Sequence, residues 1–189
     1  MRVIAGSAGG IPLHTPRTDL RPTMDRVKGA IFSSLGEKVI GARVLDLFAG
    51  SGSLGIEALS RGAAAVTFVE NNPRAVETIE RNLEKTRLAG ANSSILTLDI
   101  FSFLDRLATP QAFDVVFADP PYAKSPGERD FAPELLASLS LTRALAPDGI
   151  FVLEKLPSQQ LRIPKPWELI RAKKYGATEV AFFKITASE

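Results

Sequence analysis

A carboxylate, two prolines and an aromatic ring stand together at residues 119–122, Asp119-Pro120-Pro121-Tyr122. They follow an apolar run at residues 113–118, which predicts a buried strand. Asp119 can accept hydrogen bonds from an amino group, and Pro120 lacks an N–H, so it offers only its carbonyl oxygen. With the Tyr122 ring to stack on a flat partner, this set suits the exocyclic amine of a nucleobase. Asp-Pro is also common in an ordinary turn after a strand.

A glycine-rich loop, Gly50-Ser51-Gly52-Ser53-Leu54-Gly55, fits the pattern G-x-G-x-x-G. It lies between an expected strand at residues 43–48 and an expected helix at residues 53–60. Its glycines allow a tight turn and the close approach of a ligand. Glu70 ends the next expected strand, where a carboxylate can accept hydrogen bonds from both hydroxyls of a ribose. The pattern indicates an adenosine cofactor and is shared by dinucleotide-binding proteins.

Two more carboxylates bear on which adenosine cofactor is bound. Asp46 lies inside the strand before the loop, where it could hold a cationic amino-acid group but would repel a pyrophosphate. Asp99 ends a third expected strand, where it could accept a hydrogen bond from an adenine amine while the backbone of Ile100 or Phe101 contacts the ring. Because S-adenosylmethionine carries a cationic methionine, a ribose and an adenine, these residues favour it over NAD. Each acid could instead cap a helix or lie in a solvated loop.

The composition excludes several kinds of chemistry. The 189 residues include no cysteine, which excludes disulfides, thiolate metal sites and the cysteine adduct used to methylate pyrimidine carbon. The single histidine, His14, lies in a proline-rich stretch and is expected to be an ordinary polar residue, so we expect no catalytic triad. No apolar run is long enough to span a membrane, and the first residues lack the apolar core of a signal peptide. We therefore expect a cytoplasmic protein, and we separately expect it to bind no metal and to be a monomer.

Charge is unevenly distributed along the chain. Residues 1–43 carry seven Lys and Arg against three acids, residues 44–150 carry nine against fourteen, and residues 151–189 carry seven against four. Basic ends around an acidic middle are compatible with a polyanion that docks on the termini, and equally with ordinary solvated charge.

The alternation of apolar runs and amphipathic segments predicts an α/β fold with a mostly parallel sheet and helices on both faces. The expected strands are residues 43–48, 65–70, 94–98, 113–118, 150–156, 167–173 and 178–185, and the expected helices of this part are residues 53–60, 73–88, 100–107 and 134–145. Before them, we expect a short hairpin from residues 2–5 and 11–14 and a helix that begins at Thr23 and ends near Leu35.

These motifs together resemble the class I S-adenosylmethionine-dependent methyltransferases that act on amino nitrogens. The matching residues are Asp46-Leu47-Phe48-Ala49-Gly50-Ser51-Gly52, Glu70, Asp99 and Asp119-Pro120-Pro121-Tyr122. The N-terminal segments Arg2-Val3-Ile4-Ala5-Gly6 and Arg21-Pro22-Thr23, the helix with Arg26 and Phe32, and the Tyr175-Gly176 corner resemble more narrowly the bacterial small-subunit rRNA guanine-N2 methyltransferases. The resemblance covers nearly the whole chain, but residues 123–130 match no pattern of the family.

The resemblance implies a Rossmann-like sheet of seven strands in the order 3-2-1-4-5-7-6, with strand 7 antiparallel. It implies an N-terminal extension, residues 1–42, that contacts RNA, and a methyltransferase domain, residues 43–189. The residues expected to bind S-adenosylmethionine are Thr23, Asp46, Phe48, Ala49, Gly50, Gly52, Glu70, Asn71, Asp99 and Ile100.

The expected reaction is the transfer of a methyl group to the N2 amine of a guanine in rRNA of a small ribosomal subunit or an assembly intermediate. Asp119 and the carbonyl of Pro120 would accept the two N–H bonds of the amine, and Tyr122 would stack on an unpaired or flipped base. The residues expected to contact RNA are Arg2, Arg17, Arg21, Arg26, Lys28, Lys124 and Lys173, although solvated surface is an alternative for each.

Other functions stay open at the level of the sequence. An adenine-N6 methyltransferase of DNA or RNA uses the same tetrapeptide chemistry, and a protein glutamine or small-molecule amine is another possible acceptor. A non-catalytic RNA-binding relative is disfavoured by the intact Asp46, Gly50, Gly52 and Asp119, and Asp46 also disfavours an NAD oxidoreductase. The choice between guanine-N2 and adenine-N6 rests on the N-terminal segment and the small size of the chain.

Overall fold

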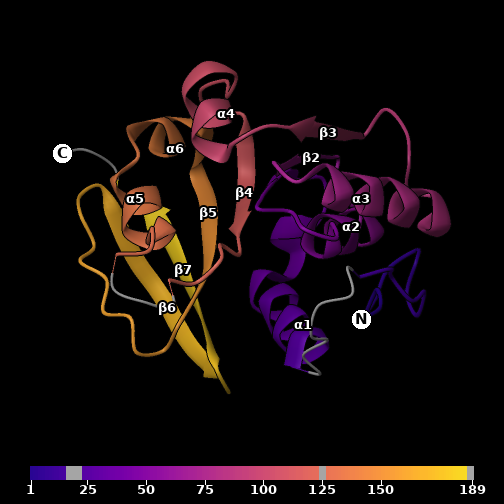
Figure 1. The fold of residues 1–189 in the computed structure, drawn as a ribbon, viewed down its shortest axis with the longest axis horizontal. Coiled ribbons are helices and arrows are strands. Elements are labelled where there is room, and N and C mark those ends of the chain that lie inside the picture. The colour runs from indigo at the N-terminus through magenta and orange to yellow at the C-terminus, as the bar shows by residue number, and fades with distance from the viewer. Residues whose placement is uncertain (16–22, 124–126, 187–189) are drawn as a thin grey trace.

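A computed structural model describes residues 1–15, 23–123 and 127–186 of the chain (Figure 1). Seven strands form one sheet in the order β3-β2-β1-β4-β5-β7-β6. Their bounds are β1 Arg43–Leu47, β2 Ala65–Glu70, β3 Ser93–Thr97, β4 Phe113–Ala118, β5 Leu145–Lys155, β6 Trp167–Tyr175 and β7 Thr178–Ile185. Strands β1 to β5 pair in parallel, whereas β7 is antiparallel to both β5 and β6. The predicted strand order and the antiparallel last strand are confirmed.

Helices cover both faces of the sheet because the strand side chains form two separate apolar clusters. One cluster joins the sheet to the helices α1 Thr23–Leu35, α2 Ser53–Ser60 and α3 Pro73–Thr86. The other joins it to α4 Ile100–Arg106, α5 Phe131–Ala137 and α6 Leu139–Ala144. Side chains alternate between the faces along each strand, so Val44 belongs to the first cluster and Leu45 to the second. Asp46 consequently faces the side of the sheet that carries α1, α2 and α3.

The predicted helix at residues 134–145 is wrong in its extent. Two short helices, α5 and α6, occupy this region and meet at Ser138, whose backbone is extended. The Ser138 hydroxyl accepts a hydrogen bond from the amide of Leu141 at 3.1 Å, so this serine caps α6 and ends α5. The capping residue of α5 is Asp130, upstream of the predicted start. Strand β5 then begins at Leu145 rather than at residue 150.

The N-terminal segment, residues 1–15, packs on α2 and α3 instead of standing away from the sheet (Figure 1). The expected hairpin is present in a short form, with an antiparallel bridge between Arg2 and Pro12 and backbone hydrogen bonds that join residues 1–3 to residues 10–13. The amides of Ile4 and Ala5 donate to the Glu57 carboxylate of α2 at 2.7 and 3.0 Å. Because this segment contributes Val3 and other side chains to the same cluster as the sheet, it shares the core of the protein. The division into residues 1–42 and 43–189 stays a prediction.

Within the described ranges, every helix is too short or too polar to cross a membrane.

Candidate active site

The glycine loop joins β1 to α2 at the carboxyl edge of the sheet, and its shape depends on left-handed backbone conformations. Gly50 and Gly52 have φ values of 56° and 75°, and Phe48 has the same unusual sign at 57°. A Cβ atom at Gly52 would lie 3.1 Å from Ile79, and one at Gly55 would lie 2.3 Å from the Phe68 ring. Gly52 therefore lets the loop pack closely against α3, and Gly55 lets α2 pack closely against β2. A Cβ at Gly50 would meet nothing closer than 3.8 Å, which leaves that side of the loop open for a ligand.

Glu70, at the end of β2, braces this loop. Its Oε2 accepts a hydrogen bond from the Gly50 amide at 2.9 Å, and its Oε1 accepts one from the Asn72 amide at 2.9 Å. A carboxylate has about four lone-pair sites, so both oxygens can still accept a bond from a ribose hydroxyl. Asn71 is exposed beside it. The structure thus gives Glu70 a scaffolding contact that the sequence did not predict, and its contact with a ribose stays a prediction.

Asp46 is 2% exposed and lies beneath the glycine loop, where its Oδ2 accepts a hydrogen bond from the Gly55 amide at 2.9 Å. The pKa of Asp46 is raised to about 8, chiefly by burial; the Gly55 amide opposes the shift, and the carboxylates of Asp119 and Glu70 contribute to it. A cationic group placed near Asp46 would favour the ionised form. The electrostatics of this position therefore suit a positively charged ligand and oppose a phosphate.

Asp99 caps α4 in the structure. Its Oδ1 accepts hydrogen bonds from the amides of Phe101 and Ser102 at 3.1 and 3.0 Å. The sequence left this capping role open as the alternative to adenine recognition. Ile100 begins α4 and its side chain is buried in the core, so only its backbone could contact a ligand. Contact between Asp99 and an adenine remains a prediction, and the residue does lie at the expected edge of the sheet.

Residues 119–122 follow β4 at the same edge as the glycine loop. Parallel pairing sets Ala118 opposite Leu47 of β1 and Leu153 of β5, so Asp119 lies between the ends of these two strands. Asp119 is exposed, whereas Pro120 is buried. The register of β1 with β4 places Asp119 near the end of β1, where the glycine loop begins, and the carboxylate of Asp119 contributes to the raised pKa of Asp46.

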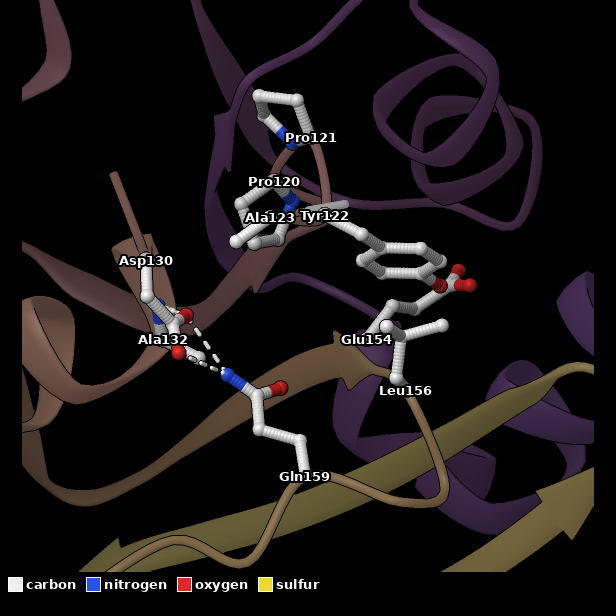
Figure 2. Close-up of a pocket in the computed structure, with 9 residues that line it drawn as sticks. All are labelled: Pro120, Pro121, Tyr122, Ala123, Asp130, Ala132, Glu154, Leu156 and Gln159. Carbon is white, nitrogen blue, oxygen red and sulfur yellow. Dashed lines mark hydrogen bonds between the residues drawn. The ribbon is translucent and has the colours of Figure 1, made fainter. Parts of the chain in front are cut away.

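Tyr122 is anchored by its hydroxyl, which forms a short hydrogen bond with the hydroxyl of Thr178 at the start of β7. Its ring lines a pocket of about 140 Å³ together with Pro120 and Pro121 (Figure 2). On the opposite wall, Gln159 donates to both carboxylate oxygens of Asp130 at 2.7 Å (Figure 2). The pocket therefore offers one aromatic wall and one polar wall.

Sequence reasoning missed Glu154, which lines the same pocket from β5 (Figure 2). Burial, followed by the neighbouring carboxylates of Asp119 and Asp46, raises the pKa of Glu154 well above its ordinary value. The available signal was an acid at the end of the apolar run at residues 150–153, the same pattern that drew attention to Asp46. It was overlooked because no motif includes it.

The loop before α5 is held by its arginine. The guanidinium group of Arg129 lies 4.9 Å from the centre of the Phe101 ring and 4.7 Å from that of Phe131, and it pairs with Glu134 at 2.7 Å. Phe131 in turn contacts the ring of Phe48 in the glycine loop, with centroids 5.0 Å apart. These contacts connect the cofactor loop to the wall of the pocket.

The residues expected to contact RNA have different environments. Arg26 and Lys173 are exposed on α1 and β6, and Arg2 is exposed while lying 3.8 Å from Asp25. Lys28 is a correction: it is 2% exposed, donates to the carbonyl of Arg2 at 2.7 Å and lies 3.4 Å from Glu57, so it holds the N-terminal segment instead of facing solvent. Outside the described residues lie Arg17, Arg21, Lys124 and, for its side chain, Thr23.

The family described as Conserved hypothetical protein 95 matches residues 1–184. Ribosomal RNA small subunit methyltransferase D of Haemophilus influenzae is 32% identical, over 97% of this chain and 93% of its own length. The protein of the same name from Escherichia coli K12 is 34% identical, over 93% of this chain and 85% of its own length. The chain belongs to this family. The solved structure of a putative methyltransferase yhhF from Escherichia coli has a TM-score of 0.83 and 29% identity, covering 100% of this chain and 99% of that one.

Membership of the family confirms the resemblance that the motifs indicated. The strand order and the structural likeness confirm the class I methyltransferase fold. The expectation of S-adenosylmethionine as the cofactor agrees with both findings. The arrangement of Asp46, the glycine loop and Glu70 fits this cofactor, since it combines a buried acid, which a cationic group would stabilise in its ionised form, with an open loop and a carboxylate at the end of β2.

Proposed function

We propose that this protein transfers the methyl group of S-adenosylmethionine to the exocyclic N2 amine of a guanine in small-subunit rRNA. The observation that carries this proposal is the position of Asp119 and Pro120 beside the cofactor loop, at one edge of the sheet. The relatives named ribosomal RNA small subunit methyltransferase D support the choice of rRNA as the substrate. The N2 amine is the finer part of the proposal.

The cofactor supplies an electrophilic methyl group on a sulfonium. Asp46 and the glycine loop would hold its cationic amino-acid end, because a buried carboxyl is stabilised in its ionised form by a nearby cation. Glu70 would accept hydrogen bonds from the ribose, and Asp99 with the backbone of Ile100 would contact the adenine. Phe48, Ala49 and Asn71 would line this path.

The exocyclic amine of guanine is a weak nucleophile because its lone pair is delocalised into the ring. Asp119 and the Pro120 carbonyl would accept its two N–H bonds and direct the nitrogen lone pair at the methyl group. As the N–C bond forms and the C–S bond breaks, the nitrogen becomes cationic. One of its protons then leaves through exposed Asp119 to solvent. The neutral thioether needs no acid to depart.

The RNA must present an unpaired or flipped guanine, since the amine of a paired base is not accessible to such a pocket. We propose that Arg2, Arg26 and Lys173 contact phosphates and position the RNA without reading its sequence. Residues 1–42 would then serve as the RNA-contacting extension. A ribosomal substrate would place the protein in the cytoplasm, and we expect it to act as a monomer.

The test is nucleoside analysis after incubation with labelled S-adenosylmethionine. Small ribosomal subunits, protein-free rRNA and duplex DNA serve as separate substrates, and the product is identified after digestion. Label in N2-methylguanine of small-subunit rRNA supports the proposal. Label in N6-methyladenine alone overturns it.

Asp119→Asn tests the role of the carboxylate in the same assay. We expect methyl transfer to fall by about a hundredfold or more, because a positioning and charge-stabilising contact is lost. Cofactor affinity should change by less than about threefold, since other residues hold the cofactor. Asp148→Asn is the matched control, because Asp148 is exposed at the opposite end of β5. Equal losses of affinity and transfer in Asp119→Asn would assign this residue a structural role instead.

A further inference from the structure

Glu154 stands beside the proposed acceptor residues without any role in the reaction described so far. In the parallel register of β4 and β5, Ala118 pairs with Leu153, so Glu154 is next to Asp119 at the strand ends. Leu153 belongs to the apolar cluster beneath α4, α5 and α6, and successive side chains alternate. Glu154 therefore faces the opposite side of the sheet, the same side as Asp46.

Among the residues that the structure describes, no cation offsets the charge of an ionised Glu154. The neighbouring Lys155 lies on the other face, where it pairs with Glu179 at 2.9 Å and donates to the carbonyl of Gln159. Burial and the charges of Asp119 and Asp46 all disfavour ionisation of Glu154, and no hydrogen-bond donor among the described residues offsets them. A mostly buried carboxyl group in such surroundings is costly unless a ligand supplies the missing partner.

A metal ion is not that partner. In the part of the chain that the structure describes, no three His, Cys, Asp or Glu side chains are grouped so that they could hold one. The pocket instead places Glu154 opposite Asp130 and beside the ring of Tyr122, in the space between the acceptor tetrapeptide and β5 (Figure 2). A flat ring that stacks on Tyr122 would bring one of its edges to Glu154.

The edges of the three amino-bearing bases differ next to the amine. In adenine and cytosine, the ring nitrogens beside the exocyclic amine are hydrogen-bond acceptors. In guanine, the ring N1 beside the N2 amine carries a hydrogen and is a donor. A carboxyl oxygen adjacent to Asp119 can therefore accept a hydrogen bond from the N1–H of guanine. With adenine or cytosine, the same oxygen would face the lone pair of a ring nitrogen.

We propose that Glu154 selects the acceptor base by accepting a hydrogen bond from the N1–H of guanine while Asp119 and the Pro120 carbonyl hold the neighbouring amine. The inference rests on the proposed function and names the residue that would decide its substrate base. Either form of the acid can make this contact, because a protonated carboxyl keeps a carbonyl oxygen that accepts a bond and can donate its hydroxyl to guanine O6. Glu154 would then be a base-reading residue.

The test compares guanine with 2-aminopurine, which keeps the amine at the same carbon but has an acceptor at N1 and no O6. Once nucleoside analysis has located the modified position, small-subunit rRNA is ligated with either base at that site. We expect the unmodified protein to methylate guanine at least about tenfold faster in single turnover, the discrimination typical of a good base contact. Equal rates on the two bases would overturn the inference.

Variants of Glu154 provide the second arm. Glu154→Met removes every hydrogen-bonding atom at nearly constant length, so the rate on guanine should fall by about tenfold or more and the preference over 2-aminopurine should disappear. Glu154→Gln keeps an acceptor oxygen and should retain the rate on guanine within about fivefold. Glu168→Met, at an exposed ion pair with Lys184 on β6, is the matched control and should behave as the unmodified protein.

The outcomes separate this inference from the proposed function. Methylation of adenine by the unmodified protein defeats both. If the unmodified protein methylates guanine N2 and Glu154→Met still prefers guanine over 2-aminopurine to the full extent, the role of Glu154 is wrong and the proposed function stands. A Gln variant as impaired on guanine as the Met variant would overturn the inference, because the Gln side chain keeps an acceptor oxygen. If a variant fails to bind the cofactor or to fold, equal rates of the unmodified protein on the two bases still overturn the inference.

Discussion

The amide of Gly55 donates a 2.9 Å hydrogen bond to Asp46, and this contact fixes a buried carboxyl group directly beneath the glycine loop. The hydrogen bond runs from α2 back to β1, so the fold of the loop and the position of the acid depend on each other. Two neighbouring carboxylates, Asp119 and Glu70, act on the same group. Burial and these two neighbouring carboxylates therefore favour the protonated form of Asp46 at neutral pH when no cationic ligand is bound.

This arrangement predicts that the cofactor-free protein loses stability as the pH rises from acidic to mildly alkaline. The pKa of Asp46 is raised from 3.8 to about 8, so between these values the folded state keeps a proton that the unfolded state has released. Raising the pH through this window therefore lowers the free energy of unfolding. Asp46→Asn, which is neutral throughout, should flatten the curve. Denaturant unfolding at several pH values measures the effect.

The control for this prediction is Asp148→Asn, since Asp148 is exposed and lies at the opposite end of β5 from Glu154. Its pH profile should follow that of the unmodified protein. Glu154→Gln should flatten the profile in the same direction as Asp46→Asn, because the pKa of Glu154 is also raised. A profile of Asp46→Asn that parallels that of the unmodified protein would contradict the buried, protonated state of Asp46.

Glu70 should matter for both stability and cofactor binding. Glu70→Ala removes the acceptor for two amides, those of Gly50 and Asn72. We expect the free energy of unfolding to fall by about 1–3 kcal/mol, since hydrogen bonds to a charged group are lost. Cofactor affinity should fall by about tenfold or more in calorimetric titration, because the loop loosens and the ribose loses an acceptor.

Glu77→Ala on α3 is the matched control, as Glu77 forms an exposed ion pair with Arg81 at 3.7 Å. It should change stability by less than about 1 kcal/mol and leave cofactor affinity unaltered. If Glu70→Ala lowers stability but binds the cofactor normally, Glu70 only braces the loop and the predicted contact with the ribose is wrong.

Much of the fold could be predicted because its strands are apolar and because glycine and proline residues mark many of the turns and helix starts between them. The buried runs ending in Leu47 and Ala118 and the glycine at the start of α2 fix a parallel sheet with its loops on one edge. The break at Ser138 could not be found by periodicity, since the apolar spacing continues through it while a side-chain hydroxyl competes for the backbone.

The candidate site could be predicted where its residues belong to a recognisable sequence motif, as Asp46, Gly52 and Asp119 do. Glu154 escaped because its importance comes from the register of β5 with β4, which no local pattern encodes. Lys28 was misassigned for a related reason: a lysine near a basic terminus suggests phosphate contact, whereas its buried ion pair with Glu57 arises only when residues 1–15 fold onto α2.

The docking of the N-terminal segment should depend on Gly6. A Cβ atom there would lie 1.8 Å from the carbonyl oxygen of Ser60, and the Ser7 amide donates to that oxygen at 2.7 Å. Gly6→Ala must therefore displace the segment, and we expect a loss of about 3 kcal/mol or more in unfolding free energy. Limited proteolysis should then cut within residues 1–15 much faster.

Gly10→Ala is a well-matched control. Gly10 has nearly the same φ, 87° against 84°, but a Cβ atom there would meet nothing within 4 Å. It should cost only the strain of a left-handed alanine, about 1–2 kcal/mol, with no rise in proteolysis of the segment. Equal effects of the two substitutions would show that backbone strain, not the contact with Ser60, controls docking.

Tyr122 combines an anchored hydroxyl with a ring that faces the pocket, and the two parts can be separated. Tyr122→Phe keeps the ring and loses the bond to Thr178, so single-turnover methyl transfer to small-subunit particles should fall by less than about tenfold, the worth of one neutral hydrogen bond. Tyr122→Ala also removes base stacking, worth about 1–3 kcal/mol, and should lower the rate about tenfold to hundredfold further. Thr178→Val should match Tyr122→Phe, and the double variant should be no worse than either, because both remove the same bond. A Phe variant as slow as the Ala variant would mean that the hydroxyl, and not stacking by the ring, is what Tyr122 contributes.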